Sequence, residues 1–155
     1  MDCLHSRSAV LRIWGYIMKA MFPPNAKRVQ LNTSHIVNAE IHRKMLSNAA
    51  SYANKNRDEI SLRLQELDHE WDTERVLEAN AAGFILISII LGFQFYYAWF
   101  YVAGIVAFFL LQHALQGWCP PLPIIRRLGI RTASEINDEK MALKALRGDF
   151  NRKKP

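Results

Sequence analysis

Cysteine is scarce in this chain of 155 residues, and its two occurrences, Cys3 and Cys119, lie far apart. Two cysteines cannot build the disulfide framework of a small secreted domain, so the count indicates a reducing compartment. We also expect no cleavable signal peptide, because Arg12 and Lys19 interrupt the apolar stretch from Ala9 to Phe22 and no small-residue cleavage site follows it.

Charged residues are missing altogether from one long stretch. No Asp, Glu, Lys or Arg occurs from Ala79 through Ile125, although 22% of the whole chain is charged. A helix crosses a bilayer with about 20 apolar residues, so this stretch is long enough for two spans and a tight turn. One soluble helix of that length would be unusual. The pattern predicts an all-α membrane protein with a two-span transmembrane helical hairpin.

We place this hairpin at residues 76–118, with spans at about 76–93 and 99–115. Aromatic rings with a polar edge prefer the two interfaces between membrane and water. Such rings gather at the turn of the hairpin and at the far end of its second span: Tyr96, Tyr97, Trp99, Tyr101 and Trp118. Small residues recur at four-residue spacing and offer surfaces for close helix packing: Ser88 with Gly92, and Ala103 with Ala107.

The arginines around the hairpin predict its orientation. Arg75 precedes it and Arg126, Arg127 and Arg131 follow it, whereas the turn has no Lys or Arg. The positive-inside rule then places both termini in the cytoplasm, with Arg126 and Arg127 at the membrane interface. Residues 126–155 carry nine basic and four acidic side chains, a balance that favours anionic lipid head groups. No nucleic-acid partner is expected, because no nucleic-acid-binding motif accompanies the charge.

Amphipathic cytoplasmic helices are predicted before and after the hairpin. Residues 1–24 form an N-terminal helix that could lie in the membrane interface with Trp14 on its apolar face. Residues 25–75 form a cytoplasmic helical arm, in which a capping box at Asn56 and Glu59 begins a helix that we expect to run through Trp71 toward the membrane.

Residues 119–155 form a proline-rich exit and a basic C-terminal helix. We expect the three prolines of the exit to prevent a regular helix there: Pro120, Pro121 and Pro123. A second capping box, Thr132 with Glu135, begins the final helix, and Gly148 ends it.

The stretches "RVLEANAAGFILISIILG" and "FFLLQHALQGWCPPLPIIRRLGIRT" resemble the YgaP-like transmembrane domain family of small bacterial inner-membrane hairpins. The resemblance covers roughly residues 74–135 and is most distinctive where Gly117, Cys119 and Pro120 are followed by Leu128 and Gly129. It implies an inner-membrane location and helix-mediated dimerisation. Some family members also carry a rhodanese domain, but this chain has no strand and helix alternation that would form one, so rhodanese activity is not implied.

Two residues near the end of the second span are candidates for chemistry. His113 is an ionisable side chain in a predicted membrane helix and could ligate haem or a metal, yet the first span offers no second histidine. Cys119 could act as a thiolate if Arg126 and Arg127 fold back and lower its pKa, but no base stands at a diagnostic spacing. We therefore expect no catalytic, cofactor-binding or metal site.

These patterns, together with the bacterial inner-membrane location that the resemblance implies, predict a non-enzymatic membrane protein that acts through helix association. Its expected partners are membrane lipids and either a second copy of itself or a larger integral membrane complex, in which it would be a small accessory subunit. The alternative is a membrane-anchored sulfur or redox protein that uses Cys119, with His113 as a haem or metal ligand.

Overall fold

The computed structural model describes residues 23–24 and 26–150. The expected N-terminal helix, with Trp14, therefore lies outside the described residues except for its last two positions. The regular elements of the described part are all α-helices: α2 (Arg28–Leu31), α3 (His35–Ser51), α4 (Arg57–His69), α5 (Thr73–Gln94), α6 (Trp99–Gln116), α7 (Leu122–Arg127) and α8 (Ala133–Arg147).

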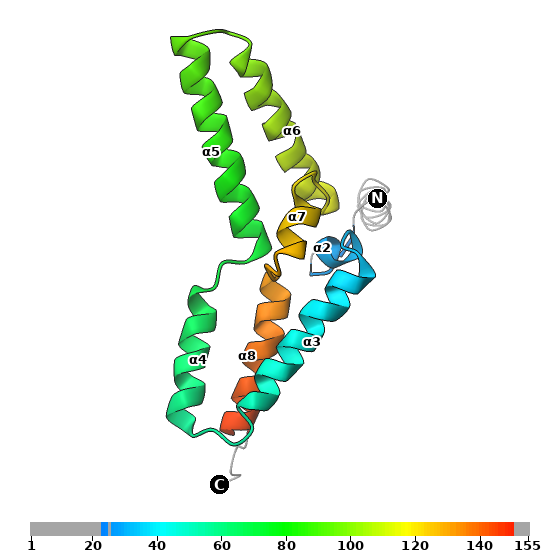
Figure 1. The fold of residues 1–155 in the computed structure, drawn as a ribbon, viewed down its shortest axis with the longest axis vertical. Coiled ribbons are helices and arrows are strands. Elements are labelled where there is room, and N and C mark those ends of the chain that lie inside the picture. The colour runs from blue at the N-terminus through cyan, green and yellow to red at the C-terminus, as the bar shows by residue number, and fades with distance from the viewer. Residues whose placement is uncertain (1–22, 25, 151–155) are drawn as a thin grey trace, which may run out of the picture.

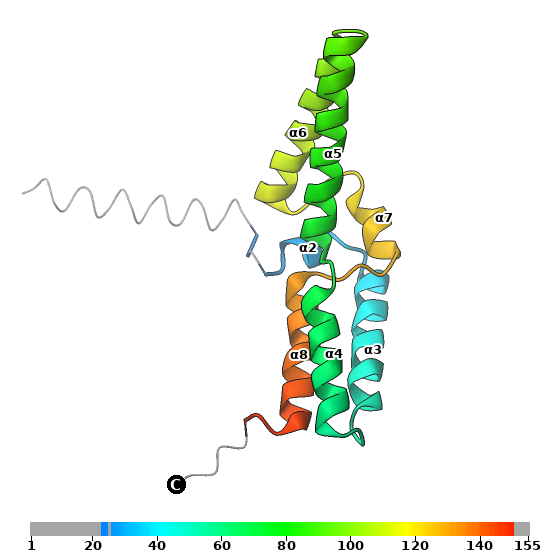
Figure 2. The same ribbon diagram turned by 90° about the vertical axis from the view of Figure 1, so that its left-hand side faces the viewer.

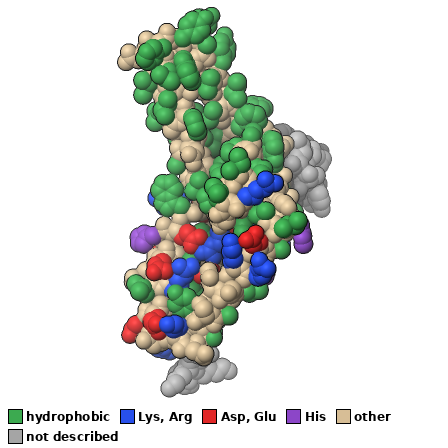
Figure 3. Space-filling view, viewed as in Figure 1, with side chains coloured by type: hydrophobic (Ala, Val, Ile, Leu, Met, Phe, Trp, Pro, Cys, Tyr) green, Lys and Arg blue, Asp and Glu red, His purple; other side chains and the backbone are tan. Residues whose placement is uncertain are grey.

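The molecule is elongated and has two halves (Figures 1 and 2). Helices α5 and α6 form an antiparallel hairpin in one half, while α3, α4 and α8 run side by side in the other. The short helices α2 and α7 lie where the halves meet. Hydrophobic side chains gather over the hairpin, and charged side chains gather over the second half (Figure 3).

Two helices of the hairpin half are long and apolar enough to cross a membrane. Helix α5 has 22 residues and α6 has 18, which at about 1.5 Å per residue approach or exceed the hydrocarbon thickness of a bilayer. At most 11% of the residues in their most apolar windows are buried within the molecule. A core helix of a soluble protein would bury most of that surface, so these helices present it outward. The predicted all-α class is confirmed.

Local capping signals define the start of α4 and both ends of α8 as predicted. The Asn56 side chain accepts from the Glu59 amide at 2.8 Å and the Glu59 carboxylate accepts from the Asn56 amide at 3.2 Å, so this capping box is confirmed. The Thr132 and Glu135 box is confirmed as well, and Gly148 ends α8 in the left-handed conformation.

Two expectations about helix boundaries are wrong. The helix that begins at Asn56 does not continue through Trp71, because α4 ends at His69 and the Asp72 side chain caps a new helix by accepting from the Arg75 amide at 2.7 Å. The exit prolines also do not prevent a helix: Pro123 lies in the first turn of α7, where its missing N–H has no intrahelical partner to lose.

Buried apolar side chains form two separate clusters. One joins α4 to α8 through Ile60, Leu64, Leu67, Ile136 and Leu143. The other lies where the two halves meet and contains Val29, Leu77, Cys119, Leu122 and Ile125. The second cluster holds the base of the hairpin against α2 and α7, which positions the candidate residues described next.

Candidate functional site

Both candidate residues line one pocket at the base of the hairpin. This pocket, the His113 pocket, has a volume of about 410 Å³ and lies between α5, α6 and α7. Its polar side chains are Asn80, His113 and Cys119, and the rest of its wall is mainly aliphatic, aromatic and proline carbon. The sequence places these polar residues up to 39 positions apart, and the antiparallel pairing of α5 with α6 brings them together.

His113 is buried, with only 4% of its surface exposed, and neither ring nitrogen has a hydrogen-bond partner within the described protein. Most buried polar side-chain atoms in folded proteins have at least one partner. A neutral imidazole offers one donor and one acceptor, so both capacities of His113 are unused. This is the most unusual polar group of the hairpin.

Cys119 is 3% exposed and packs among apolar side chains, including Leu122 and Ile125. Burial raises the pKa of its thiol, outweighing the opposite effect of the hydrogen bond from the Leu122 amide. A raised pKa leaves the sulfur protonated at neutral pH, and a protonated thiol is a poor nucleophile and metal ligand. Neither Arg126 nor Arg127 contributes to the shift in this pKa, so the condition for a reactive thiolate is not met.

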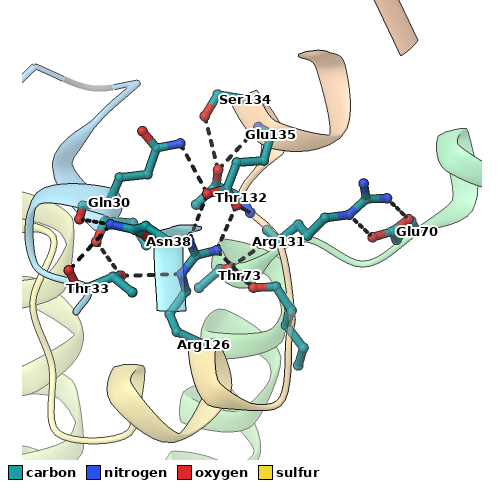
Figure 4. Close-up of polar contacts among 12 residues, drawn as sticks. Gln30, Thr33, Asn38, Glu70, Thr73, Arg126, Arg131, Thr132, Ser134 and Glu135 are labelled. Atoms are coloured by element: carbon teal, nitrogen blue, oxygen red, sulfur yellow. Dashed lines mark hydrogen bonds and ion pairs between the residues drawn. The ribbon is translucent and has the colours of Figure 1, made fainter. Parts of the chain in front are cut away.

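Arg126 instead forms the centre of a buried polar network between the halves (Figure 4). Its guanidinium donates to both carboxylate oxygens of Glu135 at 2.7 Å, and also to Asn38 Oδ1 at 3.0 Å and to the Ile130 carbonyl at 3.0 Å. The side chain is fully buried. We expected Arg126 at the membrane interface, but its bonds to α3 and α8 draw it into the protein, whereas Arg127 is exposed.

Arg131 forms a second buried connection a few residues later. It is ion-paired with Glu70, which follows α4, and with Glu139 on α8, and Arg63 of α4 donates to the same Glu139 at 3.1 Å. The Thr73 amide at the start of α5 donates to the Arg131 carbonyl at 2.8 Å. We call Arg126, Arg131, Glu70, Glu135 and Glu139 the junction network, because these residues link the base of the hairpin to α3, α4 and α8.

The predicted interface aromatics lie at the two ends of the hairpin. Tyr96 and Tyr97 are exposed in the turn, Trp99 and Tyr101 are exposed in the first turn of α6, and Trp118 is exposed just after α6. Their positions fit the predicted spacing of two aromatic belts.

The small residues divide between the inside and the outside of the hairpin. Ser88 and Ala103 are buried, and a side chain at Gly92 would meet the Phe100 ring at 2.8 Å. Ala107 is exposed instead. Gly104, one turn before it, has no neighbouring atom within 4 Å of where a Cβ would stand. The first three therefore serve packing between α5 and α6, whereas Gly104 and Ala107 are exposed on the outside of the hairpin.

A metal site finds no support in the described part of the chain, where no group of three or more His, Cys, Asp or Glu side chains could hold an ion.

Sequence patterns missed the junction network. Glu66, Glu70 and Glu74 recur at helical spacing, a pattern that is typical of a solvated helix face. Yet Glu70 binds Arg131, and Glu74 accepts from Arg28 at 2.8 Å. Two signals were available: an arginine in the exit that follows the predicted hairpin, and a glutamate in a capping box. Neither signal reveals that the two side chains pair.

Comparison of the chain with family models, curated proteins and solved structures gave no match in any of the three. The resemblance to the YgaP-like transmembrane domain family therefore stays a prediction.

Proposed function

We propose that this protein is a non-enzymatic, two-span protein of the bacterial inner membrane that acts by associating with other transmembrane helices. In this proposal α5 and α6 cross the membrane, and α3, α4 and α8 form a cytoplasmic unit. The outward apolar surface of the hairpin supports insertion. The arginines that follow α6 support a cytoplasmic location of both termini.

The observation that carries the association is an open apolar groove on α6. We call it the α6 groove, and it is lined by Phe100, Tyr101, Gly104, Ile105, Phe108 and Phe109. Gly104 leaves the helix backbone uncovered at its centre. In a membrane, small residues allow two helices to approach closely, and the resulting van der Waals contact drives their association. The groove therefore suits a helix of a second copy or of a larger membrane complex.

The junction network supports the same role, because it makes the connection between the two halves stiff. Buried arginines that each bind two or more elements fix the direction in which the cytoplasmic unit leaves the hairpin. The network thereby holds α3, α4 and α8 of this protein in a defined orientation relative to a partner that binds the hairpin.

The test is native mass spectrometry of the full chain purified in a mild detergent. We expect wild-type protein to be recovered as a homo-oligomer or with a larger partner, and Gly104→Leu to shift it to the monomer by filling the groove. Gly83→Leu is the matched control, because Gly83 on α5 also has open space around its Cβ position but lies outside the α6 groove. Recovery of wild-type protein as a lone monomer would contradict the proposal.

The alternative function, a sulfur or redox protein that uses Cys119, is supported by the pocket that Cys119 shares with His113. Burial of the thiol and its raised pKa count against it. This alternative requires that Cys119→Ser abolish a sulfur-dependent activity while the partners recovered with the protein stay the same.

A further inference from the structure

We propose that the His113 pocket binds the head of a membrane quinone, an uncharged planar ring with two carbonyl groups and an isoprenoid tail. This inference rests on the proposed insertion of α5 and α6 into a membrane, and it adds a ligand to a protein otherwise proposed to act by association.

The polarity of the pocket defines the class of ligand. None of its lining side chains is charged, and the walls are formed by residues such as Leu77, Leu110 and Ile125. A phosphate or carboxylate head would need a cationic partner inside the pocket, because burying an unpaired charge is strongly unfavourable. The occupant must therefore be uncharged and lipophilic.

His113 supplies the point of recognition. Its two ring nitrogens are buried and unpartnered within the described protein, and the residue lines the pocket. Both nitrogens are shielded from the open space of the pocket, so we infer that the imidazole turns on binding and presents its N–H to a carbonyl oxygen of the ligand, which satisfies one of them. A plain hydrocarbon chain would fill the pocket but leave both nitrogens without a bond, so the site favours a head with a hydrogen-bonding atom.

The shape of the pocket favours a ring over an extended head. Phe84 of α5 and Phe109 of α6 line it together with Pro120 and Pro121, and flat aromatic side chains pack well against a planar ring. Its volume of about 410 Å³ falls in the range of small-molecule sites. Because α5 and α6 face lipid in the proposed topology, a tail would leave the partly open pocket directly into the bilayer.

The experiment uses the full chain in phosphatidylcholine nanodiscs with an azido derivative of decylubiquinone as the photoaffinity probe. We expect labelling of residues that line the His113 pocket, mapped by peptide mass spectrometry and abolished by excess decylubiquinone. His113→Phe should lower the labelling at least about fivefold, as expected for loss of a buried hydrogen bond. His113→Gln keeps a donor and an acceptor and should retain most of it. His69→Phe, at an exposed position on α4, is the control and should label like wild type.

Three outcomes would overturn the inference: no saturable labelling, equal labelling of His113→Phe and wild type, or equal competition by dioleoylglycerol, which would assign the pocket to a hydroxyl lipid. Circular dichroism of each variant verifies that it is folded. If the Phe variant is not folded, the Gln variant still tests the inference, because loss of labelling in a folded His113→Gln protein would contradict it. Protease protection of the hairpin in the same nanodiscs separates the two proposals. A protected but unlabelled hairpin contradicts only the quinone site, whereas an unprotected hairpin contradicts membrane insertion and the quinone site with it.

Discussion

At the scale of single residues, the ion pair between the buried Arg126 and Glu135 is held by hydrogen bonds from several sides. Glu135 accepts from it at 2.7 Å with each carboxylate oxygen, and also accepts from the Thr132 amide at 2.8 Å and from Gln30 at 3.2 Å. A bidentate pair of this kind is strong and fixes geometry. Because the pair is buried, the loss of one partner leaves an uncompensated charge in the protein.

Arg126→Met is expected to lower the free energy of unfolding by about 3–5 kcal/mol, the usual cost of breaking a buried ion pair from one side. The double variant Arg126→Met with Glu135→Gln should regain more than about 1 kcal/mol, since it removes the orphaned charge as well. Thermal unfolding in detergent, followed by circular dichroism, measures both. Arg127→Met, at the exposed neighbour, is the control and should stay within about 0.5 kcal/mol of wild type.

The stability that Glu135 contributes is expected to depend on pH. Burial by itself raises the pKa of this carboxyl, but the hydrogen bonds from Arg126 and Thr132 outweigh it and hold the pKa below its ordinary value of 4.5. A lowered pKa in the folded state stabilises the protein above pH 4.5, and that stabilisation is lost as the pH falls through the folded-state value. The gap in unfolding free energy between wild type and Glu135→Gln should therefore shrink as the pH falls below 4.5. A gap that stays constant there would contradict this assignment.

At the scale of elements, glycines decide how the chain leaves its helices. Gly117 ends α6 with a φ of 76°, and Gly129 follows α7 with a φ of 83°. Both are in the left-handed region, which costs about 1–2 kcal/mol for a residue with a side chain. They differ in surroundings: a Cβ at Gly117 would lie 2.7 Å from the backbone of Arg28, whereas one at Gly129 would meet nothing within 4 Å.

Gly117→Ala should therefore destabilise the protein more than Gly129→Ala. Both variants incur the cost of an unfavourable φ, about 1–2 kcal/mol, but only Gly117→Ala also pushes α2 away from the end of α6. Comparison of their melting temperatures in the same detergent tests this expectation. Equal melting temperatures would show that α2 moves aside freely and that its contact with Gly117 does not hold the junction together.

At the scale of the whole molecule, the two halves separate surfaces of opposite character. The hairpin presents large apolar side chains such as Phe93, 80% exposed, while α4 and α8 pair their charges across the second half, as in Lys140 with Asp68 at 2.7 Å. This division fits a chain of which one half lies in lipid and the other in water. The junction network stands at the border between them.

The proposed topology predicts the behaviour of reporter fusions. A reporter that is active only in the periplasm should be active when inserted at Tyr97 in the turn of the hairpin. It should be inactive at Lys153, near the C-terminus and outside the described residues, because the arginines after α6 keep that end in the cytoplasm. The reverse pattern would overturn the orientation, and activity at both sites would overturn the two-span arrangement.

Signals carried by neighbouring residues were sufficient to predict the longer helices of the hairpin and the starts of α4 and α8, but not α7. The uncharged stretch predicted both hairpin helices, and the capping boxes at Asn56 and Thr132 predicted where α4 and α8 begin. These predictions succeeded because hydrophobic length and capping act over a few residues. The break between α4 and α5 was missed although the Asp72 cap that begins α5 is also a local signal; the pairing of Glu70 at the break with an arginine 61 positions away has no such signal.

The sequence alone therefore determined the all-helical class, the two apolar helices, the start of α4 and both ends of α8. The tertiary structure decided the roles of its polar residues. The sequence pattern predicts Arg126 at the membrane interface, but residues of α3 and α8 bind it inside the protein. Cys119 is a candidate thiolate in the sequence, but it packs in an apolar cluster with residues of α2 and α7. The physical reason is that burial and ion pairing depend on which helices pack together, and such contacts between distant segments leave no periodic pattern in the sequence.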